Sequence, residues 1–223
     1  MVGKTLGTLT LAVAIASPAL AQQPKVELTG NIGFTFSSGI SGDTVEGGDG
    51  NFYNRIEPDD AVSYAFTIGF FASEGAEVGF QWNRQQSKLL VGGPGIGNRD
   101  VGDMNVDNYH GYFAYNFGDY DVPVRPYVMI GLGATNYGSV EFNVAGQPRS
   151  TGSVSRFSTT WGAGVKFYAG PNVGLKIGAR WTPTYITSES AGWWCDPWWG
   201  CYVVGNAKYS HQFDLSGGIA LRF

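Results

Sequence analysis

Apolar and polar residues alternate with a period of two along most of this chain. In segment 76–83, for example, Ala76, Val78, Phe80 and Trp82 alternate with Glu77, Gly79, Gln81 and Asn83. Such alternation is typical of a β-strand whose two faces meet different surroundings. It recurs in segments 26–37, 62–70, 76–83, 108–117, 127–135, 161–168, 173–185 and 213–223. The sequence therefore predicts about eight strands, with helical spacing confined to the N-terminal segment.

The composition indicates what the two strand faces meet. Only 14% of the residues are charged, 15% are aromatic and 34 are glycine, whereas soluble domains are about a quarter charged. No apolar run of about 20 residues, the length of a membrane-spanning helix, follows the N-terminal segment. The face opposite the apolar one is rich in Gly, Ser, Thr and Asn, a poor surface for a soluble sandwich or lipocalin-type barrel. These features favour a membrane β-barrel with lipid-facing and lumen-facing residues. The net charge of −4 argues against nucleic-acid binding.

Short and long connections alternate between the predicted strands. Short turns are expected near 74–75, 118–121 and 169–172, and long polar or glycine-rich loops near 38–60, 88–105, 138–155 and 188–208. Membrane barrels have this arrangement, with short turns at one end and long loops at the other. The fold class predicted is all-β, a transmembrane antiparallel up-and-down β-barrel of about eight strands. An even number of strands places both termini at the short-turn end.

The first 21 residues have the features of a secretory signal peptide. Lys4 supplies a positive charge, residues 5–16 are largely apolar, and the stretch ends in the Ala-x-Ala pattern of Ala19 to Ala21. An uncleaved anchor would need about 20 apolar residues. We therefore predict cleavage after Ala21 and a barrel domain over residues 22–223.

Strand parity places seven charged side chains inside the predicted barrel. The interior of an eight-stranded barrel is just wide enough for its own side chains, and buried charges are tolerated when they are paired. We therefore predict a plug of paired charges, the alternative being a gated ion path. The residues are Glu27, Glu77, Lys166, Lys176, Arg180, Asp214 and Arg222.

The last long connection combines two cysteines with five large aromatic residues. Cys195 and Cys201 are the only cysteines, and in an exported chain such a local pair predicts a disulfide. Tryptophan and tyrosine are common binding anchors, so the loop is a candidate surface for an extracellular ligand. Alternatively, its aromatic residues cover the barrel mouth or settle at the lipid headgroups. The aromatic residues are Trp193, Trp194, Trp198, Trp199 and Tyr202.

The sequence resembles the outer-membrane β-barrel-domain family of Gram-negative bacteria, which includes opacity-type, OmpA-like and OmpX-like barrels. The resemblance is carried by the signal peptide, by Pro126–Val128 opening a Gly131-x-Gly133 strand, by Trp161–Val165 and by the final strand. It implies a location in the outer membrane, with membrane lipid, lipopolysaccharide and the barrel assembly machinery as partners. The assembly signal that it implies comprises Phe213, Leu215, Ile219, Leu221 and Phe223.

No catalytic, cofactor or metal site is predicted. His211 has outward parity, and Ser188 and Glu189 belong to the preceding strand end, but spacing alone does not make a triad. His110 has inward parity and is expected in the lumen. We predict a non-enzymatic surface protein with an envelope role or a loop-mediated interaction. The alternatives are a narrow porin-like channel for ions or small solutes, and a lipid-A-modifying enzyme.

Overall fold

A computed structural model describes residues 25–46, 50–144, 147–186, 195–196, 200–201 and 208–223. Every regular element in these segments is a strand, and no helix among them has the length and apolar character needed to cross a membrane. The strands are β1 Val26–Ser38, β2 Ile40–Glu46, β3 Phe52–Pro58, β4 Ala61–Phe71, β5 Ala76–Gly93, β6 Ile96–Asn116, β7 Val124–Tyr137, β8 Glu141–Val144, β9 Gln147–Ser150, β10 Val154–Tyr168, β11 Val173–Ile186, β12 Cys195–Asp196, β13 Gly200–Cys201 and β14 Lys208–Arg222.

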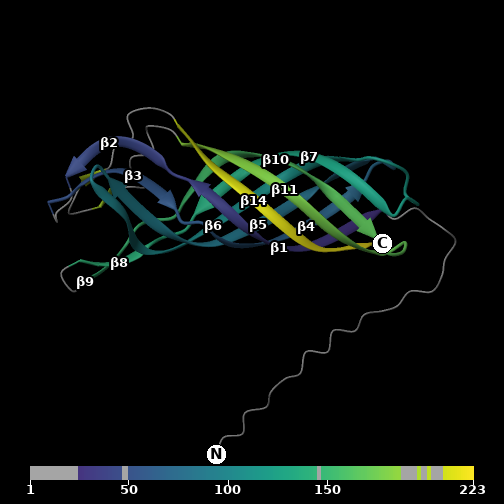
Figure 1. The fold of residues 1–223 in the computed structure, drawn as a ribbon, viewed down its shortest axis with the longest axis horizontal. Helices are drawn as coiled ribbons and strands as arrows, with labels where there is room; N and C mark the ends of the chain where they lie inside the picture. Colours follow the sequence, from purple (N-terminus) through teal and green to yellow (C-terminus); the bar gives the residue numbers. More distant parts are fainter. Residues whose placement is uncertain (1–24, 47–49, 145–146, 187–194, 197–199, 202–207) are drawn as a thin grey trace, which may run out of the picture.

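Eight of these strands form a closed antiparallel barrel (Figure 1). Each strand pairs with its neighbours in the order β1, β4, β5, β6, β7, β10, β11 and β14. The barrel closes where β14 pairs with β1, from Glu27 opposite Arg222 to Ser38 opposite His211. The predicted fold class and strand number are confirmed.

Both described ends of the chain lie at the short-turn end of the barrel. The Lys25 N–H donates to the carbonyl of Phe223 at 2.7 Å, and the Phe223 N–H donates to the carbonyl of Val26 at 2.9 Å. Gly118 adopts a positive φ of 86° in the turn between β6 and β7, a conformation that glycine accepts without steric cost. The predicted placement of the termini and the three short turns is confirmed.

At the other end, the expected long loops contain β-hairpins. β2 pairs with β3, β3 pairs with β5, and β8 pairs with β9. β5 and β6 stay paired from Ala76 opposite Tyr115 to Gly93 opposite Ile96, so a tight turn replaces the loop expected over 88–105. The expectation of loops was wrong there, because strands that leave the membrane keep hydrogen-bonding partners without keeping a regular apolar face.

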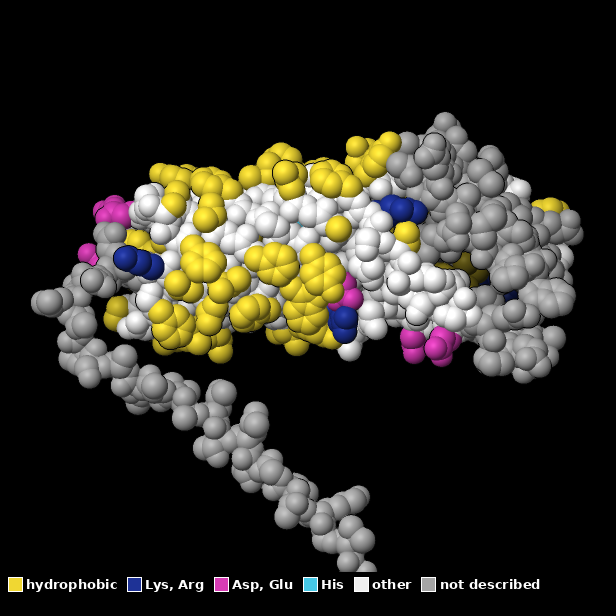
Figure 2. All heavy atoms as spheres, turned by 180° about the vertical axis from the view of Figure 1, so that it is seen from behind, with side chains coloured by type: hydrophobic (Ala, Val, Ile, Leu, Met, Phe, Trp, Pro, Cys, Tyr) yellow, Lys and Arg dark blue, Asp and Glu magenta, His cyan; other side chains and the backbone are white. Residues whose placement is uncertain are grey.

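The outer surface carries a wide apolar band (Figure 2). The outward residues are those that alternation predicted, among them Phe66, Phe80, Phe113 and Leu175. Aromatic residues lie toward both edges of the band, as in the girdles of membrane barrels. The rings of Tyr115 and Phe117 make an edge-to-face contact, and so do the rings of Tyr64 and Trp82. The apolar band ends where the long hairpins begin.

Candidate functional site: the filled barrel interior

Lys166 is the centre of a buried ionic cluster near the short-turn end. Its Nζ lies 2.6 Å from Glu27 Oε1 and 2.8 Å from Glu77 Oε2, and all three side chains are about 1% exposed. The Tyr112 hydroxyl donates to Glu77 Oε1 at 2.6 Å, and the Tyr168 hydroxyl donates to Glu27. The two carboxylates therefore share one ammonium group and are further held by phenol donors. Parity predicted the charged members; the tyrosines were assigned inward but without a role.

Two lysines lie directly opposite each other in this cluster. Lys166 on β10 pairs in register with Lys176 on β11, and both point inward. Like charges in such positions repel. Both nearby carboxylates contact Lys166, whereas the Lys176 ammonium lies 4.9 Å from the centre of the Tyr127 ring and has no ion pair in the described part of the chain. The prediction that every charge in the lumen is paired was therefore wrong for Lys176.

Two arginines close the short-turn end. The Arg222 guanidinium lies 3.2 Å from the centre of the Tyr168 ring and 3.4 Å from Glu27 Oε2. Arg125 donates to the carbonyls of Glu74 and Gly118 and lies 4.9 Å from the centre of the Tyr120 ring. Arg125 and Tyr120 were not among the residues predicted for the lumen. Arg125 precedes the alternating segment assigned to its strand, although it shares the parity of Tyr127, and Tyr120 belongs to a turn.

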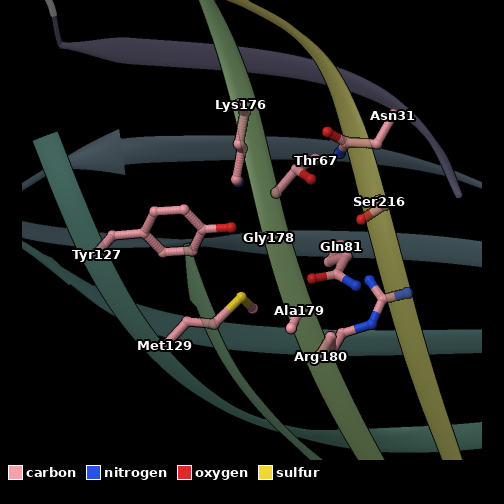
Figure 3. Close-up of a pocket in the computed structure, with 10 residues that line it drawn as sticks. All are labelled: Asn31, Thr67, Gln81, Tyr127, Met129, Lys176, Gly178, Ala179, Arg180 and Ser216. Carbon is pink, nitrogen blue, oxygen red and sulfur yellow. The ribbon is translucent and has the colours of Figure 1, made fainter. Parts of the chain in front are cut away.

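The middle of the lumen contains a small polar cavity beside the ion pair between Arg180 and Asp214. An Arg180 guanidinium nitrogen lies 3.2 Å from Asp214 Oδ1, and Asp214 Oδ2 accepts hydrogen bonds from Ser63 and Thr35. The cavity measures about 20 Å³, room for roughly one water molecule. Figure 3 shows its lining, to which six barrel strands contribute: Asn31, Thr67, Gln81, Tyr127, Met129, Lys176, Gly178, Ala179, Arg180 and Ser216.

Above the Arg180–Asp214 pair, a hydrogen-bonded layer crosses the lumen. His110 Nε2 lies 2.9 Å from Ser158 Oγ, and Asn108 Nδ2 donates to Gln212 Oε1 at 3.2 Å. Gln212 Nε2 donates in turn to Gln85 Oε1 at 2.7 Å. The His110–Ser158 contact lies inside a packed polar network and away from both ends of the lumen. His110 is thus inside the barrel, as predicted. The layer is formed by Ser37, Gln85, Asn108, His110, Thr135, Ser158, Thr184 and Gln212.

A buried apolar cluster fills the interior where the long hairpins meet the barrel. Met104, Val106 and Tyr137 are at most 2% exposed, although they continue the inward faces of polar-lined strands. The predicted polar lumen is therefore correct for the membrane segment and wrong for its outer end. Most of these positions belong to segments that were predicted to be loops. The cluster is made of Ile40, Ile56, Leu89, Met104, Val106, Tyr137, Val140 and Ile186.

His211 lies on the outer face of β14, in agreement with its parity. Its ring stacks on Trp181 with centroids 5.7 Å apart and on Tyr209 at 6.3 Å, while its backbone N–H donates to Ser38 Oγ. Ser188 and Glu189, the other members of the hydrolase hypothesis, lie outside the described residues. In the described segments, no three His, Cys, Asp or Glu side chains are grouped to hold a metal ion.

The cysteines of the last connection occupy facing backbone positions. Cys195 of β12 pairs in register with Cys201 of β13. Facing residues of antiparallel strands have Cα atoms about 4.5–5.5 Å apart, a separation that a disulfide can bridge. Their side chains lie outside the described part, so the disulfide stays a prediction. The aromatic candidates Trp193, Trp194, Trp198, Trp199 and Tyr202 also lie outside it, as does the signal peptide predicted at 1–21.

A closed eight-stranded barrel with an apolar belt and a filled polar lumen defines a transmembrane β-barrel protein. The family profile "Outer membrane protein beta-barrel domain" matches residues 7–216, and the chain belongs to this family. The protein is accordingly an outer-membrane protein that sits in the lipid bilayer with lipopolysaccharide. In outer-membrane barrels the end with long loops is extracellular and the short-turn end is periplasmic, and we expect the same orientation for this protein.

Solved structures with the same fold come from several small barrels. Neisserial surface protein A matches with a TM-score of 0.54 and 15% identity, over 89% of this chain and 97% of that one. OprG from Pseudomonas aeruginosa matches with a TM-score of 0.58 and 12% identity, over 90% of this chain and 96% of that one. AlkL, whose structure was determined in lipid bilayers, matches with a TM-score of 0.51 and 17% identity, over 93% of this chain and 94% of that one. A comparison with curated protein sequences finds no match. At such identities the likeness extends to the fold alone.

Proposed function

We propose that this protein is a non-conducting, non-enzymatic surface barrel that acts through its extracellular hairpins. The observation that carries the proposal is that the lumen is filled at successive levels. Arg125 and Arg222 close the periplasmic end, a hydrogen-bonded layer around Asn108 crosses the middle, and an apolar cluster around Met104 fills the outer end.

Because the lumen is filled at several levels, local motion at one level does not open a path for ions. An ion that passed the periplasmic arginines would still meet the hydrogen-bonded layer and then a dehydrated apolar region. Moving a charge into such a region without partners is very costly. The polar cavity between these layers has room for roughly one water molecule, which is far from a continuous aqueous path.

Planar-bilayer recording tests the closed lumen. We expect no discrete conductance steps from mature protein whose folding is confirmed by heat-modifiable gel migration, with a general porin as the positive control. Conductance steps whose ion selectivity shifts in Lys176→Glu would overturn the proposal and establish the narrow channel instead. The Lys88→Glu variant is a matched control, because Lys88 lies outside the lumen and is exposed.

Lipid A mass spectrometry tests the non-enzymatic part. The carrying observation is that His211 stacks on Trp181 and Tyr209, an arrangement suited to an interfacial aromatic girdle. We expect identical lipid A spectra from cells that overproduce the protein and from cells that lack it. Acyl-chain loss or transfer that appears on overproduction and disappears with His211→Ala would contradict the proposal.

A further inference from the structure

The lower half of the lumen contains more positive than negative charge. From the periplasmic end to the level of Asp214, the inward faces of the described strands carry three carboxylates, of Glu27, Glu77 and Asp214. The same region carries five cationic side chains, which leaves two positive charges in excess. These are Arg125, Lys166, Lys176, Arg180 and Arg222.

The excess charge is concentrated on Arg125 and Lys176, which make no direct ion pair with a carboxylate in the described part of the chain. Lys166 forms ion pairs with Glu27 and Glu77, and Arg180 forms one with Asp214. Arg125 is held by two backbone carbonyls. Lys176 has a ring face, that of Tyr127, as its compensating contact. Glu27 and Glu77 also attract the Lys176 ammonium at longer range. A cation–π contact and this attraction offset only part of the cost of burying an ammonium group, so a further anion in contact with Lys176 would stabilise it.

The polar cavity lies where such a partner would bind. Lys176 and Arg180 both line it, together with the amide of Gln81 and the hydroxyl groups of Thr67 and Ser216 (Figure 3). Gln81 is 3% exposed, and its Nε2 group is buried without a hydrogen-bond acceptor in the described structure. A buried donor is rarely left unsatisfied in a native protein. Charge and hydrogen bonding thus both call for an acceptor in the same space.

The size of the cavity restricts the chemistry of this acceptor. A cavity of about 20 Å³ favours a single small species over phosphate, sulfate or a carboxylate, each of which has several heavy atoms. A cation would add to the excess of positive charge, and a water molecule would leave it uncompensated. We propose that the cavity is a binding site for a single halide ion, chloride in the cell, held by Lys176, Arg180 and Gln81.

The ion serves as a structural counter-ion in this site. It enters as the barrel closes around it and neutralises part of the charge that the strands bring together. The proposal does not depend on the closed lumen, because a halide could occupy the same donors in a conducting barrel. Bilayer recordings can therefore overturn the closed lumen without overturning the halide site, and binding experiments can overturn the halide site without overturning the closed lumen.

Anomalous scattering locates the ion directly. Mature protein is folded in detergent and crystallised from sodium bromide, and a second crystal is grown from sodium gluconate. We expect one bromide peak inside the lumen between Lys176 Nζ and Gln81 Nε2. A lumen without an anomalous peak in the bromide crystal would overturn the proposal and assign the cavity to water.

Thermal unfolding supplies an independent readout. A ligand that binds only the folded state raises its stability with concentration, so the midpoint of the heat-induced gel shift should rise by about 3–8 °C from gluconate to chloride at constant ionic strength. Equal midpoints in the two salts would contradict the proposal. Lys176→Met should abolish the chloride dependence, whereas Lys88→Met, which removes an exposed lysine, should keep it.

A second variant keeps the test decisive if Lys176→Met does not fold. Gln81→Glu places a carboxylate beside Lys176 and Arg180 in the same cavity and so supplies the missing negative charge covalently. This variant should unfold at the same temperature in gluconate and in chloride, at or above the wild-type midpoint in chloride. Retained chloride dependence in Gln81→Glu would count against the site.

Discussion

At the residue scale, strand parity is sufficient to identify charged side chains in the lumen but not their partners. Glu27, Glu77 and Lys166 are where alternation placed them. The contacts between them join strands β1, β5 and β10, which are far apart in the sequence, so they follow from barrel closure and register. The same reason explains why Lys176 was wrongly expected to be paired.

Removal of the Lys166 charge should destabilise the barrel strongly. Lys166→Met leaves Glu27 and Glu77 buried without their shared ammonium group, and breaking one side of a buried ion pair typically costs about 3–5 kcal/mol. We therefore expect the midpoint of urea-induced unfolding in detergent micelles to move to a lower urea concentration. Adding Glu27→Gln and Glu77→Gln should recover much of the loss, because the neutral amides need no counter-charge. A midpoint unchanged in Lys166→Met would show that the cluster is not energetically coupled.

The exposed ion pair between Lys88 and Asp100 should control the reactivity of the lysine. Hydrogen bonding and attraction to Asp100 raise the pKa of Lys88 above its ordinary value, which lowers the fraction of unprotonated amine at any pH below that pKa. Asp100→Asn should therefore speed modification of Lys88 by an amine-reactive reagent at pH 8, as followed by peptide mass spectrometry. Slower modification in this variant would contradict the sign of the shift.

At the element scale, the transmembrane strands were predictable and the hairpins beyond them were not. Segments such as 108–117 alternate strictly because one face meets lipid and the other the lumen. Outside the bilayer this constraint ends. The β5–β6 hairpin continues to a turn at Pro94-Gly95, where Gly95 has a φ of 78°, but its residues no longer show the two-sided pattern.

The small β12–β13 hairpin should be closed by a disulfide. Cys195 and Cys201 face each other in its register, and an exported protein meets an oxidising compartment. We expect non-reduced mature protein to resist alkylation by iodoacetamide and to gain two alkyl groups after reduction. Alkylation of both thiols in the unreduced, denatured protein would refute the bridge.

The final strand should be needed for assembly in cells more than for stability. Phe223 is 63% exposed on the outer face, and its contribution to barrel closure is made by backbone hydrogen bonds that any residue can form. If the terminal aromatic is an assembly signal, Phe223→Ser should reduce outer-membrane insertion several-fold and leave refolding into micelles almost unchanged. Leu132→Ser, an outward substitution on another strand, is the control. Equal insertion defects in both variants would argue against a terminal signal.

At the scale of the whole molecule, the apolar belt and hairpin lengths set the orientation. Lys88 lies on the extracellular hairpin and Lys25 at the periplasmic end. A membrane-impermeant amine reagent applied to intact cells should therefore modify Lys88 and leave Lys25 unmodified, as mapped by peptide mass spectrometry. Lysed cells should show both sites modified. Labelling of Lys25 but not Lys88 in intact cells would reverse the orientation.

The length of β6 sets how far the barrel projects beyond the membrane. A strand of 21 residues extends about 70 Å at 3.3 Å per residue, and at a typical tilt near 40° it rises about 50 Å, twice the height of the apolar band of such barrels. About half of the strand therefore extends beyond the apolar band. Because β6 stays paired with β5 up to Gly93 opposite Ile96, this part projects from the membrane as a β-hairpin and not as an open loop.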